Sequence, residues 1–180
     1  RAIAGCARTR DAEAVEPIRN HVGRIALVGN GWGQPAPWAN PSLIEDAYRR
    51  EPDYLERLGV EVLPPIRFDD VIPCMGRAVI SPVIYRPLFD RLRFITCRSF
   101  ETPAAGAIPL FTQEPGFVEE VYGLPARDLV LPAESPHEKI LDVLRRPDHY
   151  AQIVCGIRRR LRERYSYQVQ FRQLLEMVEN

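Results

Sequence analysis

The sequence predicts an α/β domain in which helices cover both faces of a parallel β-sheet, followed by a helical C-terminal tail. Three observations lead to this prediction. Short apolar runs alternate with segments of helical spacing through most of the chain. The first of these runs, at residues 24–28, ends directly in a glycine-rich turn, which is typical of a buried parallel strand. From Ser135 to Asn180 almost the whole chain has helical spacing, with breaks near Pro147 and Tyr165.

The elements of the alternating part follow from composition and from their end signals. We expect strands where short apolar runs occur, at residues 24–28, 60–63, 78–84, 107–111 and 128–131. We expect helices between them, at residues 44–58, 68–75, 96–105 and 116–122. Gly59, Gly106 and Gly123 close three of these helices, because glycine readily adopts the left-handed conformation in which helices commonly end. Such alternation is typical of a Rossmann-like domain with three layers, α/β/α.

The two ends of the chain differ in character. Residues 1–22 are polar and alanine-rich, and we expect a linker or a short helix there, before a domain at residues 23–180. In the tail, Ser135 is a good helix N-cap, and Glu138 follows it at the spacing of a capping box.

Composition excludes some classes of partner. The chain has 46% hydrophobic and 27% charged residues, which are ordinary values for a globular domain. Its 24 basic and 24 acidic side chains give zero net charge, whereas nucleic-acid-binding domains usually carry a basic excess, so we expect no nucleic-acid partner. Lys139 is the only lysine. The abundant arginines suit phosphate, because a planar guanidinium bonds two oxygens at once, although GC-rich coding would produce the same bias.

Cysteine and histidine spacing indicates no metal site, and we expect no cofactor. The cysteines form no C-x-x-C pair, so we interpret them as free thiols in a reducing compartment. They are Cys6, Cys74, Cys97 and Cys155.

No apolar run approaches the roughly 18 residues that span a bilayer, and no secretory segment opens the chain. We therefore expect no membrane span and a cytoplasmic location.

The most specific pattern is TCRSFETPAAGAIPL at residues 96–110. It resembles the R-x-F-E-x-x-A-x-G helix-to-strand unit of glycosyltransferases similar to the spore-maturation protein CgeB. These belong with the group 1 glycosyl transferases to the enzymes of two Rossmann-like domains (GT-B), whose C-terminal domain holds the sugar nucleotide. The resemblance continues through residues 112–123 and returns in the final helix, at residues 165–175. It is good from about Ile72 onwards and weaker before it.

The resemblance implies one half of a GT-B fold, with a nucleotide diphosphate sugar as ligand. Transfer would require an acceptor held by an N-terminal domain outside these 180 residues. We therefore expect the chain alone to bind donor without transferring sugar.

Arg98 and Glu101 are the first candidate site residues. The resemblance makes Glu101 the carboxylate that accepts hydrogen bonds from both ribose hydroxyls. Arg98, at the start of its helix, would neutralise the diphosphate together with the helix N-terminus, without a metal. The alternative is an ordinary surface ion pair, because residues three apart on a helix are neighbours.

Loops at the carboxyl ends of strands supply the other candidates, because ligands bind there in open α/β sheets. Gly31 lies in the first such loop, where the glycine spacing departs from the dinucleotide fingerprint and also suits a plain tight turn. Thr112, Gln113 and Gly116 lie in a later loop, and Gly116 opens a helix whose N–H groups could face a phosphate.

Arg93 stands eight positions before Glu101, where many retaining GT-B enzymes carry a second glutamate. The catalytic residues and the choice between retention and inversion therefore stay open.

Two alternative functions also stay open. One is a non-catalytic flavodoxin-like binding or regulatory domain, to which the acidic pair Asp69-Asp70 gives weak support. The other is a GT-B sugar-nucleotide epimerase, which would need a histidine near the diphosphate.

Overall fold

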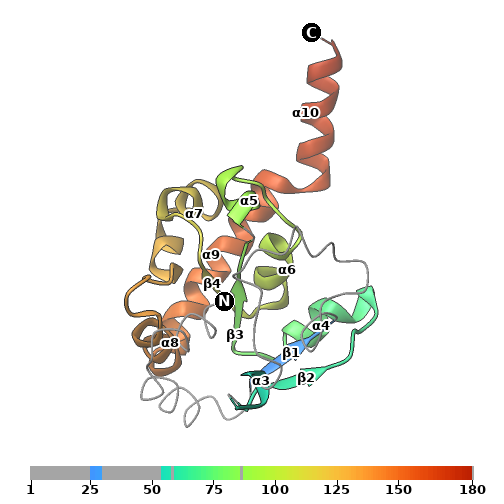
Figure 1. Ribbon diagram of the computed structural model, residues 1–180. Helices are drawn as coiled ribbons and strands as arrows, with labels where there is room; N and C mark the ends of the chain where they lie inside the picture. Colours follow the sequence, from blue (N-terminus) through green and yellow to red (C-terminus); the bar gives the residue numbers. More distant parts are fainter. Residues whose placement is uncertain (1–24, 30–53, 58, 86, 180) are drawn as a thin grey trace.

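The computed structural model describes residues 25–29, 54–57, 59–85 and 87–179 (Figure 1). The segment expected at residues 1–22 and most of the helix expected at 44–58 lie outside these residues.

The described strands all pair in parallel, which confirms the predicted α/β class. Two pairs are present: β1 (Ala26–Val28) with β2 (Glu61–Leu63), and β3 (Ile80–Val83) with β4 (Ile108–Phe111). Val83 and Phe111 are opposite one another at the carboxyl ends of the second pair, and a parallel bridge from Phe111 to Val130 extends it. Among the described residues the strands form two separate sheets, so the single continuous sheet that the sequence predicts is not observed there.

Helices make up most of the remaining described chain. In order, they are α3 (Tyr54–Arg57), the 3₁₀ helix η3 (Phe68–Asp70), α4 (Val71–Met75), α5 (Pro87–Arg91), α6 (Arg98–Ala105), α7 (Pro115–Tyr122), the 3₁₀ helix η4 (Leu124–Leu129), α8 (Pro136–Arg145), α9 (Pro147–Tyr165) and α10 (Tyr167–Glu179). The expected helices at 68–75, 96–105 and 116–122 are confirmed, as is the helical tail. Ser135 takes the N-cap position of α8, but its side chain makes no capping hydrogen bond, so the expected capping box is not formed.

The strand expected at residues 128–131 is wrong in most of its length. Residues 124–129 form η4 instead, because Pro125 stands in the first turn, where its fixed φ favours a helix. Only the chain after η4 is extended, and there Leu131 donates its N–H to the carbonyl of Phe111 at 2.8 Å. The apolar run at this position therefore supplies one bridge to β4 rather than a full strand.

The hydrophobic core surrounds β3 and β4. Every residue of β4 is buried, as expected for a strand of a parallel sheet that is covered on both faces. Helices α6 and α9 pack on this pair, and Tyr122 at the end of α7 stacks on Phe111 of β4 with ring centres 4.5 Å apart, while α10 extends away from it (Figure 1). The largest fully buried side chains include Leu110, Phe111, Leu129, Tyr150 and Ile157.

Two arginines of α9 donate hydrogen bonds to the C-terminal end of α7. Arg160 donates from Nε to the carbonyl of Val121 at 3.2 Å and from Nη2 to that of Glu120 at 3.0 Å. Arg164 donates to the Glu120 carbonyl at 2.7 Å. The last carbonyls of a helix lack partners within the helix and carry partial negative charge, so two guanidinium groups stabilise this end.

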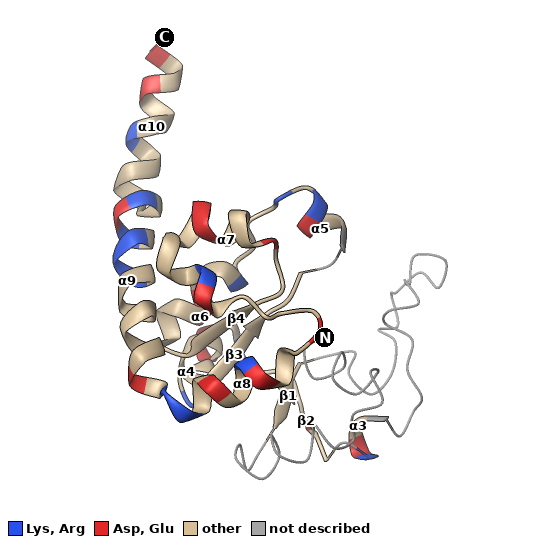
Figure 2. Cartoon of the chain, turned by 90° about the vertical axis from the view of Figure 1, so that its left-hand side faces the viewer, with Lys and Arg blue, Asp and Glu red and all other residues tan. Residues whose placement is uncertain are grey.

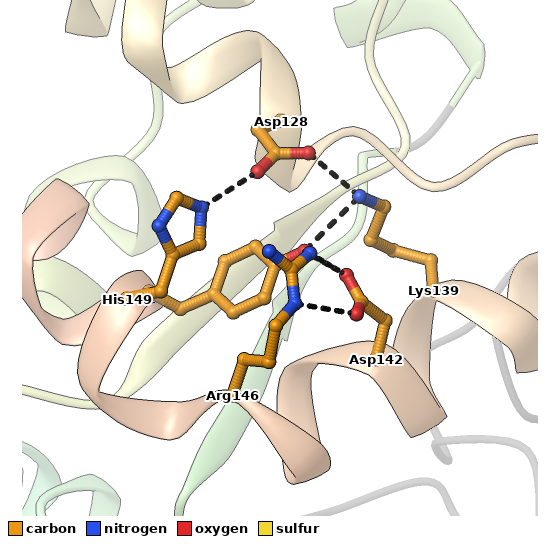
Figure 3. A network of polar contacts seen from close by, with 6 residues as sticks. Asp128, Lys139, Asp142, Arg146 and His149 are labelled. Carbon is orange, nitrogen blue, oxygen red and sulfur yellow. Dashed lines mark hydrogen bonds and ion pairs between the residues drawn. The ribbon is translucent and has the colours of Figure 1, made fainter.

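A polar network joins η4, α8 and the start of α9 (Figure 3). Its centre is the hydroxyl of Tyr150, whose side chain is fully buried. This hydroxyl donates to Asp142 and accepts from Lys139 and Arg146, each at 3.2 Å. Lys139 also donates to Asp128 at 2.7 Å, and His149 Nε2 lies 3.1 Å from the other oxygen of Asp128.

The network favours the ionised forms of its carboxyls. Partial burial opposes ionisation of Asp128, but hydrogen bonds from Lys139 and His149 outweigh it and hold the pKa of Asp128 below its usual range. Hydrogen bonds from Arg146 and Tyr150 hold the pKa of Asp142 well below its usual range. The pKa of Tyr150 is raised by burial and by its bond to Asp142, so it remains a hydrogen-bond donor.

We expect Tyr150→Phe to lower the free energy of unfolding by about 1–3 kcal/mol, because the buried hydroxyl and its bonds to Asp142 and Lys139 are lost. Urea titration monitored by circular dichroism measures this change. Tyr167→Phe is the matched control, since Tyr167 is 78% exposed and should change stability by less than about 0.5 kcal/mol. Equal stability of the two variants would contradict a structural role for the network.

We also expect acid to destabilise the fold partly through Asp128. Its folded-state pKa lies below the unfolded value of about 3.9, so its stabilising effect is full above that unfolded value. This effect is lost as pH falls through the folded-state pKa. Urea titrations from neutral pH down to about pH 3 should show a shallower loss of stability in Asp128→Asn than in wild type. Asp69→Asn, at a side chain 81% exposed, should follow wild type, and an unchanged slope in Asp128→Asn would refute the assignment.

Candidate functional site

The first turn of α6 lies beside the carboxyl end of β3. Tyr85, two residues beyond β3, places its hydroxyl against Ser99 Oγ in that first turn. The same hydroxyl accepts from the backbone N–H of Thr96 at 3.3 Å. A helix that connects two parallel strands has to run back along the sheet, so its start lies at the edge where the strands end. Arg98 and Glu101 are thereby brought to the edge at which ligands bind open α/β sheets.

Arg98 and Glu101 form the ion pair that their spacing predicts. Arg98 Nη1 lies 3.5 Å from Glu101 Oε2, and it donates to Met75 Sδ of α4 at 3.0 Å. The Arg98 side chain is 45% exposed and that of Glu101 only 13%. Glu101 Oε2 is itself buried, and among the described residues no group donates a hydrogen bond to it. A buried carboxylate oxygen without a donor is unfavourable, so this atom is suited to accept a hydrogen bond from a ligand.

The N-terminus of α6 is open. Its N-cap residue, Cys97, makes no side-chain capping bond. The N–H groups of Ser99, Phe100 and Glu101 donate to carbonyls of residues 96 and 97. Those of Cys97 and Arg98 make no hydrogen bond within the described part of the chain. Free N–H groups at a helix start, beside a half-exposed guanidinium, provide a favourable place for an anion.

The N-terminus of α7 is closed by its own side chain. Glu114 accepts from the N–H of Gly116 at 2.7 Å and from that of Phe117 at 2.9 Å. These two backbone hydrogen bonds hold the pKa of Glu114 below its usual range. The N–H of Gly116, which the sequence suggests for a phosphate, is therefore already bonded to a carboxylate.

The other expected site residues have different surroundings. Gln113 is buried, and its side-chain amide donates to the carbonyl of Val83 at 3.0 Å, so it ties the end of β4 to the end of β3. Thr112 is exposed beside it, and its backbone N–H lies 3.4 Å from the same carbonyl. Gly31 lies outside the described residues.

Arg93 packs on α7. Its guanidinium lies 2.5 Å from Glu120 Oε2 and 5.2 Å from the centre of the Phe117 ring. Its φ of 51° lies in the left-handed region, which a residue with a side chain seldom adopts. Its ion pair and ring contact with α7 hold this side chain in place.

The sequence does not indicate Tyr85 or Met75 as neighbours of the site. Their contacts with α6 come from packing between separate elements, and no local pattern marks them. Tyr85 and Ser99 are nevertheless almost fully buried polar residues, which in a folded protein have to find partners.

The polar network around Tyr150 lies far from Arg98. Phe100 of α6 contacts Tyr165 at the end of α9, with ring centres 5.6 Å apart. Tyr150 stands fifteen residues earlier on α9, which is about 22 Å at the rise of an α-helix. We therefore assign this network to the fold and not to the ligand site.

Two further findings concern metal clusters and membrane spans. No group of three or more His, Cys, Asp or Glu side chains in the described ranges could hold a metal ion. No helix among the same residues is both long enough and apolar enough to span a membrane.

Comparison with known proteins identifies a family. Neither a curated protein nor a solved structure matches the chain. The model of a family described as glycosyl transferase-like matches residues 8–176, which is nearly the entire sequence. The chain therefore belongs to the glycosyl transferase-like family.

Proposed function

We propose that the chain is the donor-binding domain of a GT-B glycosyltransferase of the CgeB-like kind, and that it binds a nucleotide diphosphate sugar where β3 and β4 end. The observation that carries this proposal is the buried carboxylate oxygen of Glu101, which accepts no hydrogen bond from the described residues and lies in an ion pair with Arg98 at an open helix start. Membership of the glycosyl transferase-like family supports a sugar donor in general.

Glu101 is suited to hold the ribose. An ionised carboxylate has two acceptor oxygens, and neighbouring hydroxyls of a ribose offer two donors. Because its side chain is 13% exposed, hydrogen bonds to it form in a partly dry environment, where charge-assisted bonds are strong. The ion pair with Arg98 neutralises this charge while no ligand is bound.

Arg98 and the start of α6 are suited to hold the diphosphate. The guanidinium can bond two phosphate oxygens, and the free N–H groups of Cys97 and Arg98 add donors on the same turn. Thr112 is exposed and available to the donor, while Gln113 supports its loop. Gly116 would reach a phosphate only after Glu114 moves away from it. No metal is required in this arrangement, because protein groups supply the positive charge.

The acceptor would be held by a second domain that packs near α10. Figures 1 and 2 show α10 extending from the end of α9, away from the other helices, and none of its residues is buried. Its exposed apolar side chains are Tyr167, Phe171, Leu174, Leu175, Met177 and Val178. An apolar helix surface of this kind is typical of an interaction site. We place the reaction between the two domains, so the chain alone would bind donor without transferring sugar.

The remaining features agree with this proposal. Cys74, Cys97 and Cys155 are free thiols, which suits the reducing, cytoplasmic setting that we propose. The epimerase alternative would need a histidine near the diphosphate. His149 is instead in the Tyr150 network, at the other end of α9.

We expect the chain to bind UDP or GDP in a calorimetric titration, and Glu101→Ala to weaken that binding about tenfold or more. The reason is the loss of hydrogen bonds to a charged group, each worth about 1.5–3 kcal/mol. Glu101→Gln keeps the size of the side chain and should be intermediate. Glu138→Ala removes an exposed carboxylate from α8 and should bind like wild type. Absence of binding to either nucleotide, or equal binding by Glu101→Ala, would contradict the proposal.

We expect Glu114→Ala to lower the thermal unfolding midpoint without weakening nucleotide binding. The variant loses both hydrogen bonds that cap α7, but leaves Arg98 and Glu101 in place. Thermal denaturation and the same calorimetric titration measure the two effects. A clear loss of affinity would place Glu114 within the donor site and would overturn the assignment of the diphosphate to α6.

A further inference from the structure

A cluster of buried hydroxyls lies beneath the first turn of α6. Tyr85 and Tyr122 are each 4% exposed, and Ser99 is fully buried. The Tyr85 hydroxyl contacts Ser99 Oγ and also accepts from the N–H of Thr96. Tyr122, the last residue of α7, adds a third hydroxyl, and Ser99 and Tyr85 are its hydrogen-bonding neighbours. Burial raises the pKa of Tyr122 well above its usual range. The cluster therefore connects α6 to the end of β3 and to α7.

This cluster holds the start of α6 in place without bonding the free N–H groups of Cys97 and Arg98. The N-cap residue of α6 makes no capping bond, and the N–H of Thr96 is instead bonded by Tyr85 from another element. Apolar contacts alone leave a short helix some freedom to rotate or slide, because they are not directional. Hydrogen bonds between buried groups are directional and costly to break, so they select one arrangement.

The orientation of α6 that these hydrogen bonds select is the one in which Arg98 and Glu101 face the proposed donor site. Ser99 directly follows Arg98, and two residues separate it from the next buried hydroxyl on the helix, that of Thr102. Arg98 and Glu101 lie on the neighbouring face of the same two turns. A small rotation of α6 would change both the exposure of Arg98 and the burial of Glu101 Oε2.

We propose that Tyr85 is a positioning residue for nucleotide binding: through Ser99 and the N–H of Thr96 it fixes the first turn of α6, and so the direction in which Arg98 and Glu101 face the donor. This inference rests on the proposed function of Arg98 and Glu101. Tyr85 acts from behind the helix and itself makes no contact with the nucleotide.

The test compares two variants that each remove one buried tyrosine hydroxyl. Tyr85→Phe should weaken binding of UDP or GDP, whichever wild type binds, by roughly three- to tenfold, as expected for one buried hydrogen bond. Tyr150→Phe loses a hydroxyl at the far end of α9 and should bind the nucleotide like wild type, although it is destabilised. Both are measured by calorimetry at a temperature where circular dichroism shows each variant folded. Wild-type affinity in Tyr85→Phe, or equal losses in the two variants, overturns the proposal.

A double-mutant cycle separates positioning from general loosening of the fold. In a Glu101→Ala background, Tyr85→Phe should cause a smaller loss of affinity than in wild type, because one of the two groups that it orients is already absent. Full additivity of the two losses overturns the inference. Ser99→Ala removes the partner hydroxyl with a smaller change of volume, and it should reproduce both the loss and the coupling if Tyr85→Phe does not fold. Wild-type binding by Glu101→Ala would instead refute the proposed function itself, whatever Tyr85→Phe does.

Discussion

The parallel pairing of β3 with β4 is the constraint on which the rest of the described structure depends. Consecutive parallel strands cannot be joined by a tight turn, so the chain has to return along the sheet through a crossover helix. α6 serves this purpose, and Gly106, with a φ of 80°, lets the chain pass from it directly into β4. Every residue of β4 is buried, which leaves little freedom in where α6 lies. The position of Arg98 and Glu101 is thus a consequence of strand pairing.

Two helices begin near the ends of these strands, and their first turns differ in chemistry. In α7 the carboxylate of Glu114 accepts hydrogen bonds from the N–H groups of the first turn, so these groups are already bonded within the chain. In α6 no side chain caps the helix, and Arg98 stands at its first position, where the guanidinium and the partial positive charge of the helix start would both attract a phosphate. A helix start at a strand end is therefore not enough to indicate a site. The contrast between a closed and an open start is what distinguishes α6.

Local patterns explain how much of this could be predicted from the sequence. The helix at 96–105, its glycine stop and the strand after it follow from spacing and composition alone, as does the neighbourhood of Arg98 and Glu101. The prediction is wrong at 128–131, where an apolar run resembles a strand but Pro125 favours a 3₁₀ turn. The contacts of Gln113 and Tyr85 could not be predicted, because their partners are 30 and 14 residues away in the sequence. Such contacts depend on packing, which single-sequence patterns do not encode.

The two tyrosine-centred networks stabilise different parts of the described structure. Around Tyr150 the partners are charged and partly exposed, so the network holds α8 on α9 and responds to the protonation of its carboxyls. Around Ser99 the partners are neutral hydroxyls in the interior, and burial moves the pKa of Tyr122 still further from neutrality. The cluster behind α6 therefore keeps its hydrogen bonds across the range in which Asp128 titrates. Protonation of Asp128 would weaken the α8–α9 corner, whereas the hydroxyl cluster behind α6 contains no carboxyl that acid could protonate.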